Sequence, residues 1–200
     1  METGAMDESY VENNQAGDLF LPWSPDVIVY TMGKVGSSSM SASLQAKRIK
    51  CFDVHVLNPK RLQQLIVKSI QNADRIAVAP NFLASAAALN ALMRRRRNGE
   101  ATKIITAVRE PIGRNISAVF QNMPPSVKDR PDEIARLVST YSVLSPDAWF
   151  ETDFQPTTGL NVLGGRHDRE AGTFRFKNDL FDVLLLKVEI PDSEKEAAIS

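Results

Sequence analysis

Residues 26–47 constrain the fold of this chain more than any other segment. The run Asp-Val-Ile-Val-Tyr-Thr at residues 26–31 has the nearly continuous apolar character of a buried parallel strand. It leads into Met-Gly-Lys-Val-Gly-Ser-Ser-Ser at residues 32–39, and we expect a helix from near Ser38 to about Lys47. A strand, a loop with glycines and a helix N-terminus can cradle phosphate, because glycine allows close backbone approach and the helix start presents free N–H groups. An ordinary strand-to-helix turn capped by serine is the alternative interpretation.

A second strand-to-helix junction lies near the middle of the chain. Residues 103–108 predict a strand that ends at Arg109, and Pro111 suits the first turn of a following helix. Apolar residues recur at helical spacing in that helix and are expected to face a core: Ile112, Ile116, Val119 and Phe120. Arg109 and Ser117 could then converge on a phosphate, since a guanidinium fork and a hydroxyl both donate hydrogen bonds to one. The alternative is an amphipathic helix whose arginines are only solvated.

The first loop does not have the Walker A order, because its lysine comes before the second glycine rather than after it. Lysine, one residue, glycine and then hydroxyl residues is the order in sulfotransferases that use 3′-phosphoadenosine 5′-phosphosulfate (PAPS), and the two junctions together resemble that family. Arg109 and Ser117 have the family's separation of eight positions. The sequence around Arg109, Val-Arg-Glu-Pro-Ile-x-Arg-Asn-Ile-Ser, is similar to that of the carbohydrate-modifying branch of the family. Residues 33–39, 120–122 and 149–159 are similar to a group described as capsular polysaccharide synthesis proteins, and the resemblance covers roughly residues 26–189.

The resemblance implies a P-loop-type three-layer α/β/α sandwich with a central parallel sheet, and strands that alternate with helices predict such a sheet independently. It also implies that the 5′-phosphosulfate of PAPS is bound by Lys34, Val35, Gly36, Ser37, Ser38 and Ser39. Arg109 and Ser117 would bind the 3′-phosphate, and Lys34 would meet the charge on the leaving oxygen. No metal is implied.

A histidine or glutamate commonly serves as the general base in this family. His55 lies in the second predicted strand, residues 52–57, on the same face as Asp53. His55 is therefore the candidate base, and a hydrogen-bonded core histidine is the alternative.

Further strands are predicted at residues 75–79 and 181–188, and further helices at residues 59–71, 82–97 and 131–144. Residues 155–172 are expected to form a loop. Trp149, Phe150 and Phe154 are expected in the core rather than in a sugar-binding platform. We expect one domain at residues 25–200. Members of the family are usually longer, which leaves open that acceptor-binding and adenine-side elements follow Ser200.

Charge is distributed unevenly, although 24 basic and 24 acidic residues balance overall. Residues 1–24 hold five acidic and no basic residues, and are expected to form a mobile tail. The remainder has a modest basic excess that suits an anionic ligand and is too small to indicate nucleic-acid binding. The single Cys51 cannot form an internal disulfide, and one cysteine with two histidines does not suit a structural zinc site.

No apolar run approaches the roughly 20 residues of a membrane span, so a cytoplasmic protein is expected, with a luminal domain of a membrane-anchored enzyme as the alternative. The expected partner is a carbohydrate or another hydroxyl-bearing acceptor, and oligomeric state stays open. Two alternative functions remain open. One is a P-loop nucleotide kinase with Glu189, after a buried strand, as the magnesium-binding carboxylate. The other is a non-catalytic nucleotide-binding or scaffold module.

Overall fold

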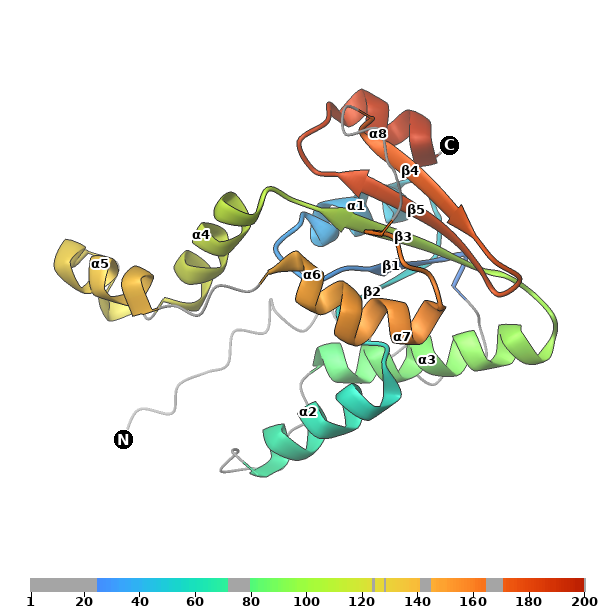
Figure 1. Cartoon of the computed structure of the whole chain (residues 1–200), viewed down its shortest axis with the longest axis horizontal. Helices are drawn as coiled ribbons and strands as arrows, with labels where there is room; N and C mark the ends of the chain where they lie inside the picture. The colour runs from blue at the N-terminus through green and yellow to red at the C-terminus, as the bar shows by residue number, and fades with distance from the viewer. Residues whose placement is uncertain are drawn as a thin grey trace.

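A computed structural model of the chain describes residues 25–71, 80–123, 125–127, 129–140, 145–164 and 171–199. Its centre is a five-stranded sheet with the strand order β2-β1-β3-β5-β4 (Figure 1). The strands are β1 (Val27–Tyr30), β2 (Cys51–Val54), β3 (Thr102–Val108), β4 (Thr173–Lys177) and β5 (Phe181–Lys187). β1, β2, β3 and β5 pair in parallel, whereas β4 runs antiparallel to β5 at one edge. The prediction of a central parallel sheet is therefore confirmed for four strands, and the fifth makes the sheet mixed.

Helices cover both faces of the sheet, which gives three layers. On one face, α1 (Ser37–Ala46) and α8 (Asp192–Ile199) pack over apolar side chains of β1, β3 and β5. The other face carries α3 (Pro80–Arg97) and a continuous helical segment composed of α6 (Pro146–Trp149), η4 (Phe150–Phe154) and α7 (Gln155–Thr158). α2 (Pro59–Gln71) packs beside α3 (Figure 1).

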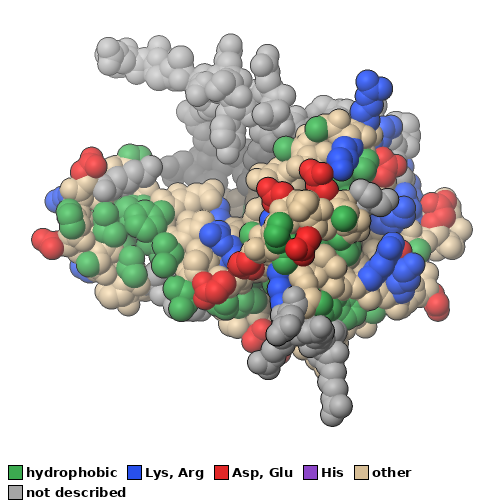
Figure 2. All heavy atoms as spheres, turned by 90° about the horizontal axis from the view of Figure 1, so that it is seen from above, with side chains coloured by type: hydrophobic (Ala, Val, Ile, Leu, Met, Phe, Trp, Pro, Cys, Tyr) green, Lys and Arg blue, Asp and Glu red, His purple; other side chains and the backbone are tan. Residues whose placement is uncertain are grey.

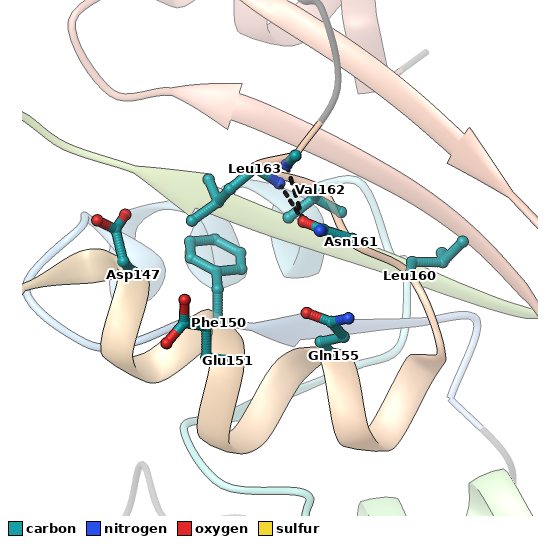
Figure 3. A pocket seen from close by; sticks show the side chains of 9 residues that line it. Asp147, Phe150, Glu151, Gln155, Leu160, Asn161, Val162 and Leu163 are labelled. Carbon is teal, nitrogen blue, oxygen red and sulfur yellow. Dashed lines mark hydrogen bonds between the residues drawn. The ribbon is translucent and has the colours of Figure 1, made fainter.

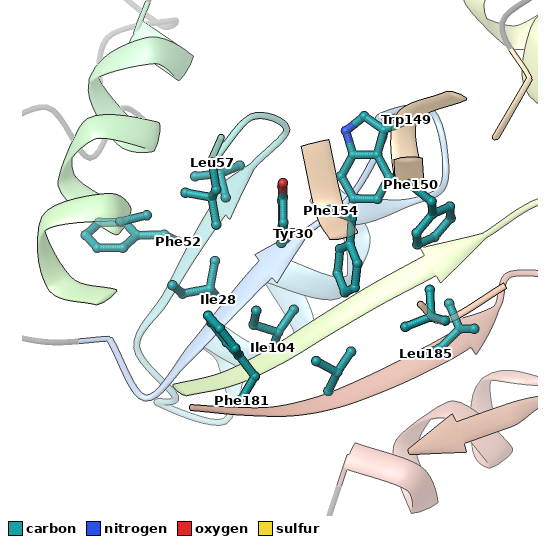
Figure 4. Close-up of a cluster of buried hydrophobic side chains, with 14 of the residues drawn as sticks. Ile28, Tyr30, Phe52, Leu57, Ile104, Trp149, Phe150, Phe154, Phe181 and Leu185 are labelled. Carbon is teal, nitrogen blue, oxygen red and sulfur yellow. The ribbon is translucent and has the colours of Figure 1, made fainter. Parts of the chain in front are cut away.

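An aromatic cluster forms the centre of the second face. Trp149, Phe150 and Phe154 are 7%, 3% and 0% exposed, and Tyr30 from β1 is fully buried beneath them (Figure 4). The ring centroid of Tyr30 lies 4.9 Å from that of Trp149 and 5.3 Å from that of Phe154. These are contact distances for aromatic pairs, so the prediction that the three aromatic residues belong to the core is confirmed.

Several predicted elements differ from the structure. The second strand ends at Val54 instead of reaching residue 57, because the N–H groups of Leu57 and Asn58 bond to the Asp153 carboxylate rather than to a neighbouring strand. Part of the predicted loop at residues 155–172 is helical, as α7, and the antiparallel strand β4 follows it. The predicted tail at residues 1–24, the strand at 75–79 and the end of the 131–144 helix lie outside the described residues.

The segment formed by α4 (Pro111–Asn122), η3 (Pro125–Val127) and α5 (Pro131–Thr140) projects from the rest of the molecule (Figure 1). It has a small core of its own made by Val119, Met123 and Val127. The expectation that the whole apolar stripe of α4 faces a core is wrong: three of its residues, Ile112, Ile116 and Phe120, are 69%, 48% and 51% exposed. Figure 2 shows hydrophobic side chains gathered over this projecting lobe. Within the described part of the chain, no helix has the length and apolar character needed to cross a bilayer.

Candidate functional site

The loop between β1 and α1 has an unusual backbone. Gly33, Lys34 and Gly36 have φ angles of 81°, 62° and 75°, all in the left-handed region. Glycine adopts this region freely, whereas it costs a residue with a Cβ roughly 1–2 kcal/mol. Lys34 is thus held in an unfavourable backbone conformation, as often occurs at functional sites.

The N-terminus of α1 presents donors without a protein cap. Gly36 occupies the N-cap position, and the structure describes no side-chain cap there. The N–H groups of Ser37, Ser38 and Ser39 have no partner inside the helix. A Cβ placed on Gly36 would meet no atom within 4 Å, so there is open space beside the helix start. A helix N-terminus of this kind can bind an anion.

Arg109 brings the second junction into contact with this loop. Arg109 directly follows β3, and its Nη1 donates a hydrogen bond of 3.4 Å to the carbonyl oxygen of Lys34. Glu110 accepts hydrogen bonds from the N–H groups of Ile112 and Gly113, which lower the pKa of its carboxyl below the usual range. Glu110 therefore caps α4. Glu189 accepts a hydrogen bond of 2.8 Å from the Glu110 N–H, which fixes the start of α4 against the end of β5.

One face of α4 is polar and points toward the loop. Arg114, Ser117 and Gln121 are spaced by three and four residues, so they share one side of the helix. Gln121 Oε1 accepts a hydrogen bond from Lys34 Nζ, and the charge of Arg114 acts on Lys34. Ser117 lies between these two contacts on the helix and is half-buried. Lys34 thus contacts both Arg109 and α4, and Ser117 lies on the same side of that helix as Gln121.

The neighbourhood of Lys34 is cationic. Burial, together with the nearby positive charge of Arg114, lowers the pKa of Lys34 below the usual range for lysine. Arg114 itself is only 5% exposed, and its Nη1 donates a hydrogen bond of 2.9 Å to Asn115. Like charges held together are unfavourable until an anion enters, and perturbed groups of this kind gather at functional sites.

His55 lies on the opposite side of the loop, directly after β2. Its Nδ1 is 3.0 Å from the carbonyl oxygen of Thr31. Because a carbonyl oxygen can only accept, Nδ1 carries the proton and the lone pair is left on Nε2. A Cβ placed on Gly33 would lie 3.7 Å from that Nε2, so the basic nitrogen sits beside the loop.

Asp53 precedes His55 on the same strand. Burial raises the pKa of its carboxyl above the usual range, although the charge of His55 and the hydroxyls of Ser37 and Ser41 partly oppose this. In the part of the chain that the structure describes, its Oδ1 is buried and has no hydrogen-bond partner.

Two cavities flank the site. One, of about 290 Å³, lies on the α1 face beside Gly36 and Ser39 of the loop. Apolar side chains of β3, β5 and α8 line it together with four charged ones: Lys187, Asp192, Lys195 and Glu196. The other, of about 330 Å³, lies on the opposite face, where Asp147, Glu151 and Gln155 point into it from the helical segment (Figure 3). Among the described residues that line the second cavity, two are carboxylates and none is a cation, which makes it unsuitable for phosphate. The first cavity has two lysines beside its two carboxylates and reaches the start of α1.

No family model, curated protein or solved structure matches this chain. What the site can do therefore follows from its own geometry.

Two residues of the site were missed by sequence reasoning. Arg114 and Gln121 were not assigned a role, although their spacing around Ser117 marks a polar face on α4.

Val35 is 1% exposed, so only its backbone can take part in binding. Among the described residues, no group of three or more His, Cys, Asp or Glu side chains is placed to hold a metal ion.

Proposed function

We propose that this protein is a PAPS-dependent sulfotransferase that transfers a sulfuryl group from PAPS to an acceptor hydroxyl. One observation carries the proposal: Arg109 contacts the loop at residues 33–39, while Lys34 reaches across to Gln121 on the polar face of α4. Two anion-binding regions are thereby adjacent, at the ends of neighbouring parallel strands. PAPS has negative charge at both its 5′ and 3′ positions and needs such a pair of sites.

The parts of the donor are assigned to groups of matching chemistry. The N–H groups and hydroxyls of residues 37–39 would bind the 5′-phosphosulfate, as helix N-termini bind phosphates elsewhere. Arg109 and Ser117 would bind the 3′-phosphate. The cavity of about 290 Å³ beside the loop lies at the carboxyl ends of β3 and β5. There Ala107, Leu186 and Val188 could contact the adenine ring, while charged side chains of β5 and α8 line the rest of the cavity.

The reaction needs one base and one cation. The acceptor oxygen forms a bond to sulfur while the bond between sulfur and the 5′-phosphate oxygen breaks, giving a sulfate ester and 3′,5′-ADP. His55 Nε2 takes the proton of the acceptor hydroxyl, since Nδ1 holds its own proton against Thr31 and Nε2 lies next to Gly33 of the loop. Lys34 stabilises the negative charge on the leaving phosphate oxygen. The assignment of a carbohydrate as acceptor comes from the resemblance of residues 108–117 to carbohydrate sulfotransferases.

Calorimetric titration tests the donor site. 3′,5′-ADP is expected to bind without magnesium and more tightly than ATP–magnesium. Lys34→Ala is expected to lower turnover of PAPS on a panel of polysaccharides by roughly 10²–10³-fold. Lys47→Ala is the matched control, since Lys47 is exposed at the other end of α1, about 15 Å away. Near-normal sulfation by Lys34→Ala, or tighter binding of ATP–magnesium, would show that the proposal is wrong.

A P-loop kinase is the second candidate, and Asp53 is the observation that favours it. Asp53 lies on the strand beside β1, near Ser37, where a magnesium-binding carboxylate of a kinase could stand. Its raised pKa opposes this role, because a magnesium ligand must be ionised. If ATP binding depends on magnesium and Asp53→Asn abolishes that dependence, the kinase is supported. Binding of 3′,5′-ADP without transfer to any acceptor would instead favour a non-catalytic nucleotide-binding module.

A further inference from the structure

Asp153 is a fully buried carboxylate in the middle of the helical segment that covers the sheet. It is 0% exposed and lies in η4, where the helix widens into a π-helical turn. Its Oδ1 accepts hydrogen bonds from the N–H groups of Leu57 at 2.9 Å and Asn58 at 3.2 Å, and from the hydroxyl of Tyr30. Arg61 lies 3.5 Å from Oδ2. A buried carboxylate is unfavourable unless it is paired and hydrogen-bonded, and all these partners lie close to His55 in the chain or to the loop after Tyr30.

Trp149, one helical turn earlier, holds His55 directly. Its Nε1 donates a hydrogen bond of 2.9 Å to the carbonyl oxygen of His55. The imidazole of His55 in turn donates from Nδ1 to Thr31 at the base of the loop. His55, Leu57 and Asn58 thus each have a backbone hydrogen bond to the helical segment. The His55 ring bonds to Thr31, directly after β1.

Trp149 and Asp153 are four residues apart, so their side chains lie on the same side of the helical segment. Trp149, Phe150, Asp153 and Phe154 are all buried. Trp149 and Asp153 bond to residues 55–58, while Phe150 and Phe154 belong to the aromatic cluster on the sheet. The segment also contains a π-helical turn, a feature that is frequent at functional sites.

We propose that Asp153 and Trp149 are positioning residues for His55, which keep its imidazole in place beside Gly33 of the donor loop. The inference rests on the proposed function, in which His55 is the general base. It assigns the helical segment at residues 146–158 a role in setting the tautomer and placement of that base. Displacement of a catalytic group by about 1 Å can lower a rate by roughly 100-fold, so loss of one attachment is expected to act on the rate more than on donor binding.

Trp149→Phe is the decisive variant. It keeps an aromatic ring in the cluster and removes the Nε1–H that bonds to His55. Asp153→Asn is a second variant, which keeps the size of the side chain and removes its charge. Phe181→Leu is the matched control, because Phe181 is 3% exposed in the same core and lies on β5, away from residues 55–58. The loss of thermal stability is measured for each variant, so that Trp149→Phe and Asp153→Asn are compared with Phe181→Leu at a similar loss.

Three measurements separate positioning from general destabilisation. The first is long-range ¹H–¹⁵N NMR of the imidazoles, in which His55 is assigned through His55→Gln; the chain has only two histidines. We expect the Nδ1–H tautomer of His55 in the wild type and in Phe181→Leu, and a mixture of tautomers in Trp149→Phe. The second is calorimetry with 3′,5′-ADP, whose Kd is expected to stay within about twofold. The third is kcat against pH, in which Trp149→Phe is expected to lower kcat roughly 10- to 100-fold and to shift the limb that His55 produces.

The outcomes are distinguishable. If Trp149→Phe and Asp153→Asn change neither the tautomer nor the pH profile more than Phe181→Leu does, the positioning role is refuted. If the wild type fails to bind 3′,5′-ADP, or if His55→Gln keeps full activity, the proposed function fails. The NMR comparison still decides in that case whether the helical segment fixes the His55 ring.

Discussion

Replacement of Arg109 gives a sharp test of the donor site. Arg109 is half-buried at the end of β3 and has a guanidinium that can bind a phosphate through two parallel hydrogen bonds. Hydrogen bonds to charged groups contribute about 1.5–3 kcal/mol. Since each 1.4 kcal/mol is tenfold in affinity, Arg109→Ala is expected to weaken 3′,5′-ADP binding roughly 10- to 100-fold.

The ratio of two affinities isolates the 3′-phosphate. Arg109 also donates to the carbonyl oxygen of Lys34, so its removal loosens the loop and weakens every nucleotide that binds there. 5′-AMP lacks the 3′-phosphate and reports this shared effect alone. Wild-type protein is expected to prefer 3′,5′-ADP over 5′-AMP, and Arg109→Ala is expected to bind the two alike. Arg109→Lys should fall between them, because lysine keeps the charge and loses the planar fork.

Calorimetry with both nucleotides at about 0.15 M salt measures the ratio. Lys103→Ala is the matched control, because Lys103 is an exposed cation on the same strand, about 20 Å from Arg109. At that separation its charge is screened. If Arg109→Ala keeps the wild-type preference for 3′,5′-ADP, then Arg109 does not bind the 3′-phosphate and the reasoning that joins the two junctions is refuted.

The remaining predictions concern charge and packing. Asp53→Asn should raise the free energy of unfolding at pH 7: burial raises the pKa of Asp53, so ionisation of this carboxyl destabilises the fold as pH rises through the raised value. This gain in unfolding free energy, measured by chemical denaturation, should shrink as pH falls toward about 4. A gain that stays the same at every pH would contradict the prediction. Burial and Arg114 lower the pKa of Lys34, so this lysine should lose its charge at a lower alkaline pH than an ordinary lysine, and the affinity for 3′,5′-ADP should fall there. Lys34→Arg stays charged and should show no such fall. Phe154→Ala should cost about 3–5 kcal/mol of unfolding free energy, because the ring is 0% exposed. Ile116→Ala, at a side chain that is 48% exposed, should stay within about 0.5 kcal/mol, and equal losses would show that α4 is buried.

The junctions of the fold could be predicted because they depend on local chemistry. β1 is a short apolar run, and β3 and β5 contain apolar stretches at residues 104–105 and 183–186. Such stretches are typical of parallel strands that are buried on both faces. The start of α1 and the end of α3 follow from residues with clear local preferences, such as Gly99 with its φ of 70° after α3. β4 was missed because it is an edge strand with alternating exposed residues, and its pattern becomes meaningful only beside β5.

Orientation of α4 could not be predicted from its periodicity. The helix has an apolar stripe ending at Phe120 and a polar stripe ending at Gln121, and periodicity alone does not say which one meets the body of the protein. The polar stripe faces the loop, because Gln121 bonds to Lys34, and most of the apolar stripe is left exposed. Burial depends on a partner element, and the partner here is a cationic loop rather than a sheet.

The places where local rules are broken lie around the loop after β1. Lys34 adopts a backbone conformation that suits glycine, and its ammonium lies near the charge of buried Arg114. Three serines follow Gly36, yet none caps the first turn of α1. Asp53 is half-buried, and its Oδ1 has no hydrogen-bond partner in the described part of the chain. Each of these features is unfavourable for stability, and features of this kind gather at functional sites. A ligand with phosphate at both ends can contact both cationic regions and should bind more tightly than inorganic phosphate. At equal ligand concentration, we therefore expect 3′,5′-ADP to raise thermal stability more than inorganic phosphate does.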